Sequence, residues 1–444
     1  MSAAGQHPQD LSLREQAARI ASGELDPNEL LAATLERIDA REDELNSTPL
    51  TFAPEAEAML AAAPPGPLKG VPLTVKDMFS MPWHGARSAT ADTLLPPGES
   101  GMFRRLRDGG AVVAGLANQH ALGWGTTGHI SAYGAHGNPW DPRRSPGGSS
   151  GGSAAAVSAR LVAGSVGSDS GGSARIPAAY CGVVGLKLTY GGVPRDGYTG
   201  ALTSLSAWGA LARDAADTRL LTEVLLSRPL ERSGGAGLRV GLVRTPYWDD
   251  CDPAVVASCE QALATAGWAT QDIALAAGEL LPAAGIVRTM TELVPATPAH
   301  VLAAADPLVR AYALYARLWP AMLVARADRV RAQLRVDLVR AFEHVDVIAW
   351  PTVPAPAPLL ESPVVELPSG AVPADAANVR QATAANLAGV PGISVPVAPH
   401  PSGLPVGLQL LAPWGAAAVL LAAAEHLEAA TERAFVDARP PLAR

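Results

Sequence analysis

Apolar and polar segments alternate along the first part of the chain in a pattern that predicts helices and strands in turn. Capping boxes at Ser12–Glu15 and Asp26–Glu29 predict two N-terminal helices. The apolar residues 70–76 predict a buried strand. A helix over 101–108 that stops at two glycines, followed by a strand over 111–116, continues the pattern. This alternation predicts an α/β fold with a large mixed, mostly parallel sheet covered by helices on both faces.

The remaining chain extends the same pattern. The segment 297–344 is strongly helical, because charged residues are interspersed among apolar ones at helical spacing. We expect further helices at 152–160, 214–226, 252–266 and from about 415, and strands at 161–168, 238–243, 346–352, 386–396 and 406–411.

Composition excludes several classes of function. The 444 residues carry a net charge of −8, with a pI near 5.6, which argues against a nucleic-acid-binding surface. The uncharged segment 404–424 is divided by two prolines and a glycine, so we expect core elements there and no membrane partner. Residues 1–10 lack the apolar core of a signal peptide, and we therefore expect a cytoplasmic protein.

The three cysteines, Cys181, Cys251 and Cys259, are odd in number and lack the spacing of metal ligands. We expect ordinary thiols in a reducing compartment. No His, Cys, Asp or Glu cluster has ligand spacing, so we expect neither a metal nor an organic cofactor.

Two clusters of glycine and serine suggest chemistry, Gly147–Gly152 and Ser168–Ser173. A serine hydroxyl is a weak nucleophile and needs a base, and a lysine can be that base if burial keeps it neutral. Lys76 stands at the end of an apolar strand, where a charged amine is unfavourable. Consecutive glycines let backbone N–H groups converge, which predicts an oxyanion hole formed by the N–H groups of Ser170, Gly171, Gly172 and Ser173.

Simpler interpretations of these clusters fit the context less well. A flexible linker is not expected to lead into a helix, a strand and a second glycine-serine cluster. Residues 147–152 also match the G-x-S-x-G elbow of α/β-hydrolases, but that fold requires a strand directly before the serine, and 138–146 is rich in proline. The segment 169–172 is similar to a trypsin-like nucleophile loop. Those proteases are disulfide-bearing β-barrels, however, whereas this chain has three cysteines and an α/β pattern.

Residues 147–187 resemble the signature of the amidase signature family almost from end to end. The resemblance implies the catalytic triad of that family, with Lys76 as base, Ser149 as proton relay and Ser173 as nucleophile of an acyl-enzyme mechanism. It also implies a cis peptide between Gly148 and Ser149. Ser150, Asp169 and Arg175 are implied to orient the catalytic groups.

The resemblance covers most of the chain and implies one amidase-signature domain over 1–444. We expect a helical N-terminal layer at 11–60 and a catalytic core at 68–226 with the signature at 147–187. The other expected parts are a variable helical region at 245–343, where substrate preference tends to be set, and C-terminal strands with a helix at 346–428.

By family position, the acyl pocket is expected between 118 and 133 and between 190 and 208. The candidate substrate-binding residues are Trp124, His129, Ile130, Tyr133, Tyr198 and Leu202. Such an apolar pocket favours aryl or bulky amides.

Several branches of the family remain open: amidases, carbamate (urethane) hydrolases with the same triad, and the A subunit of glutamyl-tRNA amidotransferase. We favour a stand-alone hydrolase of a small-molecule amide or carbamate, as a monomer or homodimer. The chain is short for that part of the amidotransferase, and it shows no convincing pocket for a glutamine carboxylate. A scaffold protein on an inactive amidase fold would require the loss of Lys76, Ser149 or Ser173, and all three are present.

Overall fold

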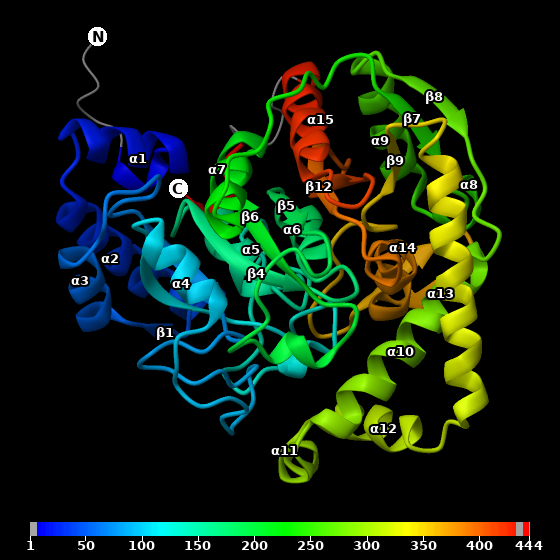
Figure 1. Ribbon diagram of the computed structural model, residues 1–444, viewed down its shortest axis with the longest axis horizontal. Coiled ribbons are helices and arrows are strands. Elements are labelled where there is room, and N and C mark those ends of the chain that lie inside the picture. Colours follow the sequence, from blue (N-terminus) through cyan, green and yellow to red (C-terminus); the bar gives the residue numbers. More distant parts are fainter. Residues whose placement is uncertain (1–6, 432–437, 444) are drawn as a thin grey trace.

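An 11-stranded sheet forms the centre of the protein (Figure 1). The structure is a computed structural model that describes residues 7–431 and 438–443, apart from the side chains of residues 201 and 202. In sheet order, the strands are β1 (Leu50–Thr51), β3 (Val112–Ala117), β2 (Pro72–Lys76), β4 (Gly164–Asp169), β6 (Ala207–Ala212), β5 (Val184–Lys187), β12 (Gly392–Pro399), β13 (Pro405–Leu411), β9 (Val347–Pro351), β7 (Arg239–Leu242) and β8 (Ala269–Asp272).

Parallel and antiparallel ladders occur within this one sheet. β2 runs parallel to both β3 and β4, and β7 runs parallel to both β8 and β9. The other six neighbouring pairs are antiparallel. A separate two-stranded ribbon joins β10 (Val364–Leu367) to β11 (Gly370–Pro373). The α/β fold with a mixed sheet is confirmed.

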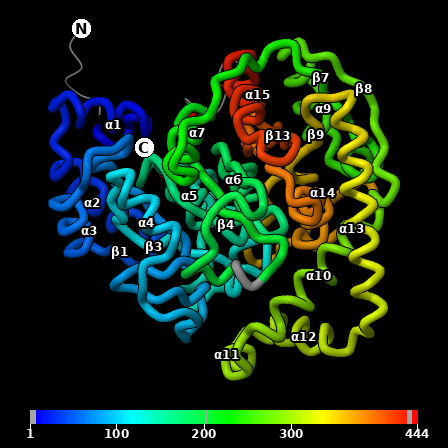
Figure 2. The backbone as a smooth tube through the Cα atoms, viewed as in Figure 1, coloured from blue at the N-terminus to red at the C-terminus, as the bar shows by residue number. Residues whose placement is uncertain are grey.

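Helices cover both faces of the sheet, as Figures 1 and 2 show. On β6 the adjacent residues Ala210 and Leu211 belong to different hydrophobic clusters, because successive strand side chains point to opposite faces. The helices are α1 (Leu13–Ser22), α2 (Pro27–Leu45), α3 (Ala53–Ala61), α4 (Gly101–Asp108), α5 (Gly151–Ser158), α6 (Arg175–Cys181), α7 (Ala215–Leu226), α8 (Arg244–Tyr247), α9 (Pro253–Thr265), α10 (Leu281–Ala296), α11 (Ala299–Ala304), α12 (Pro307–Ala316), α13 (Ala321–Ala341), α14 (Ala374–Ala388) and α15 (Ala417–Ala430). α5 and α6 contribute to the cluster of Leu211, whereas α7 and α15 contribute to the cluster of Ala210.

Two predicted elements differ from the structure for identifiable reasons. The helical segment 297–344 is divided into α11, α12 and α13, and prolines stand at both breaks: Pro307 begins α12 and Pro320 caps α13. Proline has no backbone N–H and cannot continue the preceding helix. The segment 386–396, predicted as a strand, begins inside α14, whose C-terminus is capped by Gly389 with a left-handed φ of 86°. β12 follows at Gly392.

Strand direction brings the two glycine-serine clusters and the lysine to one edge of the sheet. β2 and β4 are parallel neighbours, with Thr74 beside Ser165 and Val75 beside Val166. Lys76 is the last residue of β2 and Asp169 the last of β4, so both lie at the carboxyl edge, where open α/β sheets position their sites. α5 begins directly after Ser150 and packs against both strands.

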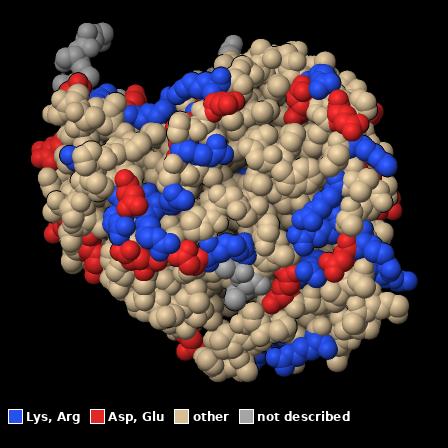
Figure 3. Space-filling view, in the orientation of Figure 1, with Lys and Arg blue, Asp and Glu red and all other residues tan. Residues whose placement is uncertain are grey.

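Figure 3 shows acidic and basic side chains interspersed over the visible face of the molecule. Within residues 7–431 and 438–443, the structure contains no helix with the length and hydrophobicity needed to span a bilayer.

Candidate active site

The amine of Lys76 lies at the centre of a buried cluster of serine hydroxyls. Lys76 Nζ lies within hydrogen-bond distance of Ser149 Oγ at 2.7 Å, Ser168 Oγ at 2.8 Å and Ser150 Oγ at 3.0 Å. In its neutral form the amine donates to two of these hydroxyls and accepts from the third. Lys76, Ser149, Ser150 and Ser168 are each no more than 1% exposed. Among the described residues, no carboxylate lies within ion-pair distance of this amine. Its three hydrogen-bonding partners are therefore neutral.

Burial determines the protonation state of this lysine. Removal from water lowers the pKa of Lys76 well below the usual value of a lysine, and the attraction of Asp169 opposes that shift without cancelling it. A neutral amine can accept a proton, whereas an ammonium group cannot. The lowered pKa therefore lets this amine accept a proton at a lower pH than an exposed lysine does.

Backbone contacts hold the loops of Ser149 and Ser173 against each other. The peptide between Gly148 and Ser149 is cis, which confirms the prediction. The N–H of Ser150 donates to the carbonyl oxygen of Ser173 at 3.1 Å, and the carbonyl of Ser149 accepts from the N–H of His120. Ser173 is 6% exposed and lines a cavity.

The loop before α6 lines that cavity with Ser170, Gly171 and Ser173. Within the described part of the chain, no hydrogen bond occupies the amides of Ser170, Gly171 or Ser173. The Gly172 amide, which the sequence predicts as a member of the oxyanion hole, donates instead to Asp169 Oδ1 at 2.8 Å. Gly172 has a φ of 112°, and a Cβ there would meet the Cβ of Ala382 at 2.3 Å. Glycine at this position therefore fixes the path of the loop.

A buried ion pair supports this loop. Arg175 donates to both carboxylate oxygens of Asp169 at 3.0 Å, and it also donates to Gln409 at 2.7 Å and to Asn386 at 2.9 Å. Both members of the pair are fully buried. Burial alone would raise the pKa of Asp169, but Arg175, Lys187 and Asn386 bring it down to about 2. Asp169 and Arg175 thus stabilise the loop from its buried side.

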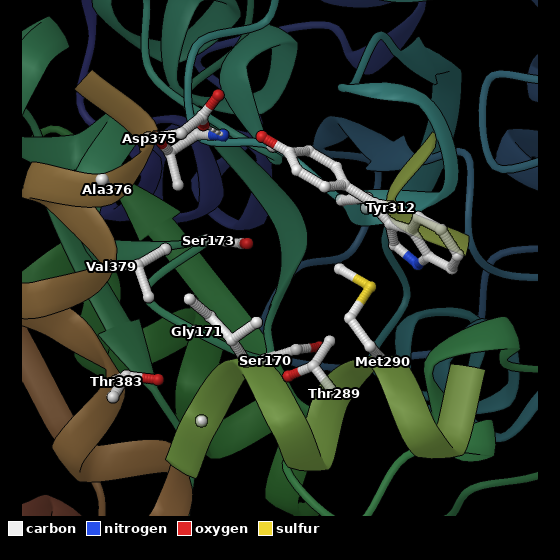
Figure 4. A pocket seen from close by; sticks show the side chains of 16 residues that line it. Ser170, Gly171, Ser173, Thr289, Met290, Tyr312, Asp375, Ala376, Val379 and Thr383 are labelled. Atoms are coloured by element: carbon white, nitrogen blue, oxygen red, sulfur yellow. Dashed lines mark hydrogen bonds between the residues drawn. The ribbon is translucent and has the colours of Figure 1, made fainter. Parts of the chain in front are cut away.

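Ser173 opens into a cavity of about 210 Å³ with mostly apolar walls (Figure 4). One side is the loop from Gly123 to Thr126. The other walls come from α10, α12 and α14. The side chains that line it beyond this loop and Ser170, Gly171 and Ser173 are Ile286, Thr289, Met290, Tyr312, Asp375, Ala376, Val379 and Thr383.

One of the six predicted substrate-binding residues, Trp124, lines this cavity. His129 and Ile130 line a neighbouring cavity of about 490 Å³, and His129 Nδ1 is hydrogen-bonded to Thr127 Oγ1 at 2.6 Å. Tyr133 donates through its hydroxyl to Asp77 at 3.2 Å. The side chain of Leu202 lies outside the part of the chain that the structure describes.

Tyr198 lies in the core beside the site. It is 3% exposed and stacks on Phe79, with ring centroids 4.7 Å apart. Its hydroxyl is hydrogen-bonded to Ser206 Oγ at 2.5 Å. Tyr198 therefore supports the site without lining the cavity beside Ser173.

The cavity residues of α10, α12 and α14 are not among those predicted from the sequence. The region containing α10 and α12 was expected to influence substrate preference, but no individual residue in it was named. The apolar positions Ile286 and Met290 are four residues apart and lie on one face of α10. That spacing could have indicated a face of α10 that lines a cavity, but the same spacing is equally typical of core packing.

Comparisons with known proteins find similar sequences and folds over nearly the whole chain. The family model described as Amidase matches residues 29–277 and 288–421. The A subunit of the glutamyl-tRNA(Gln) amidotransferase of Chromohalobacter salexigens is 32% identical, over 95% of this chain and 97% of the relative. Its counterpart of the same name in Azotobacter vinelandii is 34% identical, over 95% of this chain and 98% of the relative. A crystal structure of an amidase has a TM-score of 0.89 and 31% identity, and the match covers 94% of this chain and 99% of that chain.

Proposed function

The chain belongs to the amidase signature family, and on this basis we propose that it is a serine hydrolase that cleaves carboxylic amides through an acyl-enzyme. Ser173 is the nucleophile, Ser149 relays the proton and Lys76 is the base. The single observation that best supports this proposal is the hydrogen bond of 2.7 Å between the buried Lys76 amine and Ser149 Oγ. Burial keeps that amine in the form that accepts a proton.

The proposed reaction has two halves. In the first, Ser173 Oγ attacks the amide carbon while its proton passes to Ser149 and the proton of Ser149 passes to Lys76. The unoccupied amides of Gly171 and Ser173, with that of Ser170, stabilise the negative oxygen. Return of the proton to the nitrogen breaks the C–N bond and leaves an ester on Ser173. In the second half, water attacks this ester by the same relay and releases the acid.

The cavity supports substrates with a bulky or aryl group. Its walls are mostly apolar, and Trp124, Met290 and Tyr312 offer surfaces against which an aromatic ring can pack. A carbamate presents the same carbonyl group to Ser173, so a urethane hydrolase with the same triad remains within this proposal. The residues supply the nucleophile, base and oxyanion donors without a metal or organic cofactor.

A second candidate function is the A subunit of a glutamyl-tRNA amidotransferase. It is favoured by the curated relatives, which carry that name and match this chain over nearly their whole length. The walls of the cavity weigh against it, because none of the described lining residues is Lys, Arg or His, and such a cation is the usual partner of a free carboxylate like that of glutamine. The alignment with the Chromohalobacter relative also extends over 481 positions, so that protein contains segments that this chain of 444 residues lacks.

Turnover by the purified single chain distinguishes the two functions. We expect the protein alone to hydrolyse aryl amides or aryl carbamates at a higher kcat/KM than glutamine, with all activity absent in Ser173→Ala. Glutaminase activity that appears only when a second protein co-purifies would support the amidotransferase role instead. Turnover that persists in Ser173→Ala would contradict both.

A further inference from the structure

One carboxylate lies in the wall of the cavity beside Ser173. Asp375 is in the first turn of α14 and is partly exposed. Figure 4 shows it at the same cavity as Ser173, on the side toward which the hydroxyl of Tyr312 points. It is the only acidic residue among those that line the cavity, and the described lining contains no basic residue that could neutralise it.

The hydrogen bonds of Asp375 leave one oxygen available. Oδ1 accepts from the backbone N–H of Thr126 at 2.5 Å and from its hydroxyl at 2.7 Å. Both donors are neutral. Among the described residues, Oδ2 has no hydrogen-bond partner and Asp375 has no ion pair. A carboxylate can accept at both oxygens, so this one is anchored through Oδ1 while Oδ2 keeps its acceptor capacity.

The surroundings of this oxygen fit a positive charge. The walls are mostly apolar, which strengthens an electrostatic interaction relative to the same contact in water. The aromatic rings of Trp124 and Tyr312 line the same cavity. Aromatic faces attract organic cations, so they add to the attraction of the carboxylate.

We infer that Asp375 binds an ammonium group of the substrate, which makes the preferred substrate an apolar amide that also carries a cationic amine. This inference rests on the proposed function and adds the substrate class to it. Asp375 is a specificity residue: it selects by charge, while Ser173, Ser149 and Lys76 act on the amide bond. The same carboxylate disfavours substrates with a free carboxylate, because like charges repel.

The test uses pairs of substrates that differ by a charge at nearly constant shape. One pair carries the charge on the acyl side: 3-aminopropanoyl 4-nitroanilide and butanoyl 4-nitroanilide. The other carries it on the amine side: the acetyl amides of 4-(aminomethyl)aniline and of 4-ethylaniline. N-acetyl-3-aminopropanoyl 4-nitroanilide separates the effect of positive charge from that of a neutral N–H donor.

We expect kcat/KM to favour the cationic member of at least one pair by about fivefold, the usual scale of a partly exposed ion pair. Asp375→Asn, which keeps an acceptor for Thr126, should reduce that ratio to below about twofold. Glu279→Gln is the matched control, because it removes one negative charge from an exposed residue that does not line the cavity. It should leave the ratio unchanged.

A binding measurement keeps this test separate from the proposed function. Calorimetric titration of Ser173→Ala with each pair measures charge preference without turnover. Absence of a cationic preference in both pairs, or a preference that persists in Asp375→Asn, would overturn the role of Asp375. A preference equally strong for the N-acetyl compound would show recognition of a neutral N–H group and would also overturn it. Failure of every amide to be hydrolysed, with the binding preference intact, would contradict the proposed function alone.

Discussion

The cluster around Lys76 and the cavity wall beyond Ser173 lie next to each other but differ in construction. Lys76, Ser149, Ser150 and Ser168 come from the ends of two neighbouring strands and the start of one helix, and all are buried. The cavity wall is assembled from α10, α12 and α14, and Tyr312 in it is 46% exposed. In the buried cluster the amine has three hydroxyl partners, whereas the wall presents apolar side chains and one carboxylate. Under the proposed function, the buried cluster performs the chemistry and the cavity wall sets the substrate preference.

The largest effect is expected at the point where the two regions meet. Ser173→Ala should reduce kcat by at least about 10⁴-fold, because the nucleophile is removed and the relay has nothing to activate. Ser153→Ala is a matched control, since Ser153 is a buried serine of the same segment with no hydrogen-bond partner for its hydroxyl among the described residues. It should retain activity within about twofold of the parent. Comparable losses in the two variants would mean that the segment, and not the Ser173 hydroxyl, is responsible.

The second prediction concerns pH within the buried cluster. Because burial lowers the pKa of Lys76, the amine becomes neutral as pH rises through that lowered value, and kcat/KM should increase over the same range to a plateau. Below that pKa the lysine is protonated and cannot act as base. Lys76→Met should abolish most activity and remove this rising limb from any residual rate. A pH profile of Lys76→Met that keeps the limb would assign it to another group.

The third prediction tests the support behind the cluster. Arg175→Met leaves the Asp169 carboxylate buried without its cation, so the free energy of unfolding in urea should fall by about 3 to 5 kcal/mol. Arg143→Met breaks the ion pair with Asp141, in which the arginine is 81% exposed, and should leave the unfolding free energy unchanged within error. Equal stability of the two variants would show that the buried pair is not needed for the fold.

The smallest predicted effect is at the cavity wall. Tyr312→Ala should lower kcat/KM for aryl amides by about tenfold, because a large apolar surface is lost, and should leave acetamide hydrolysis nearly unchanged. Tyr315→Ala is the control on the same helix, since Tyr315 is 63% exposed and does not line the cavity. If the ratio of kcat/KM for aryl amides to kcat/KM for acetamide is unchanged in Tyr312→Ala, the cavity wall has no role in specificity.

The sequence predicted the two regions with unequal success, for a physical reason. Lys76 and Asp169 stand at the ends of adjacent parallel strands, and local pattern together with the signature is sufficient to bring them to one edge. The cis peptide before Ser149 was also anticipated. The hydrogen bond from the Gly172 amide to Asp169 was not predicted, because it depends on the orientation of one side chain.

The cavity wall depends on tertiary packing that no local pattern encodes. α10 packs against α14, which begins almost eighty residues after α10 ends, so Met290 and Asp375 line one cavity only in the folded chain. Tyr198 looked like a pocket residue by position, but stacking on Phe79 takes its ring into the core. An aromatic residue on a loop can either line a pocket or pack in the core, and its neighbours in the folded chain determine which of the two occurs.

The central claim is that the Lys76 amine activates Ser173 through Ser149, and covalent labelling tests it most directly. The parent protein is treated with a fluorophosphonate, and the modified peptide and the labelling rate are measured by mass spectrometry, in parallel with Lys76→Met, Ser149→Ala and the Ser153→Ala control. We expect a single label on Ser173, a labelling rate that rises with pH in the parent, and rates reduced by at least about 100-fold in Lys76→Met and Ser149→Ala but not in the control. A label on any other residue, or Ser173 labelling at the parent rate in Lys76→Met, would contradict the claim.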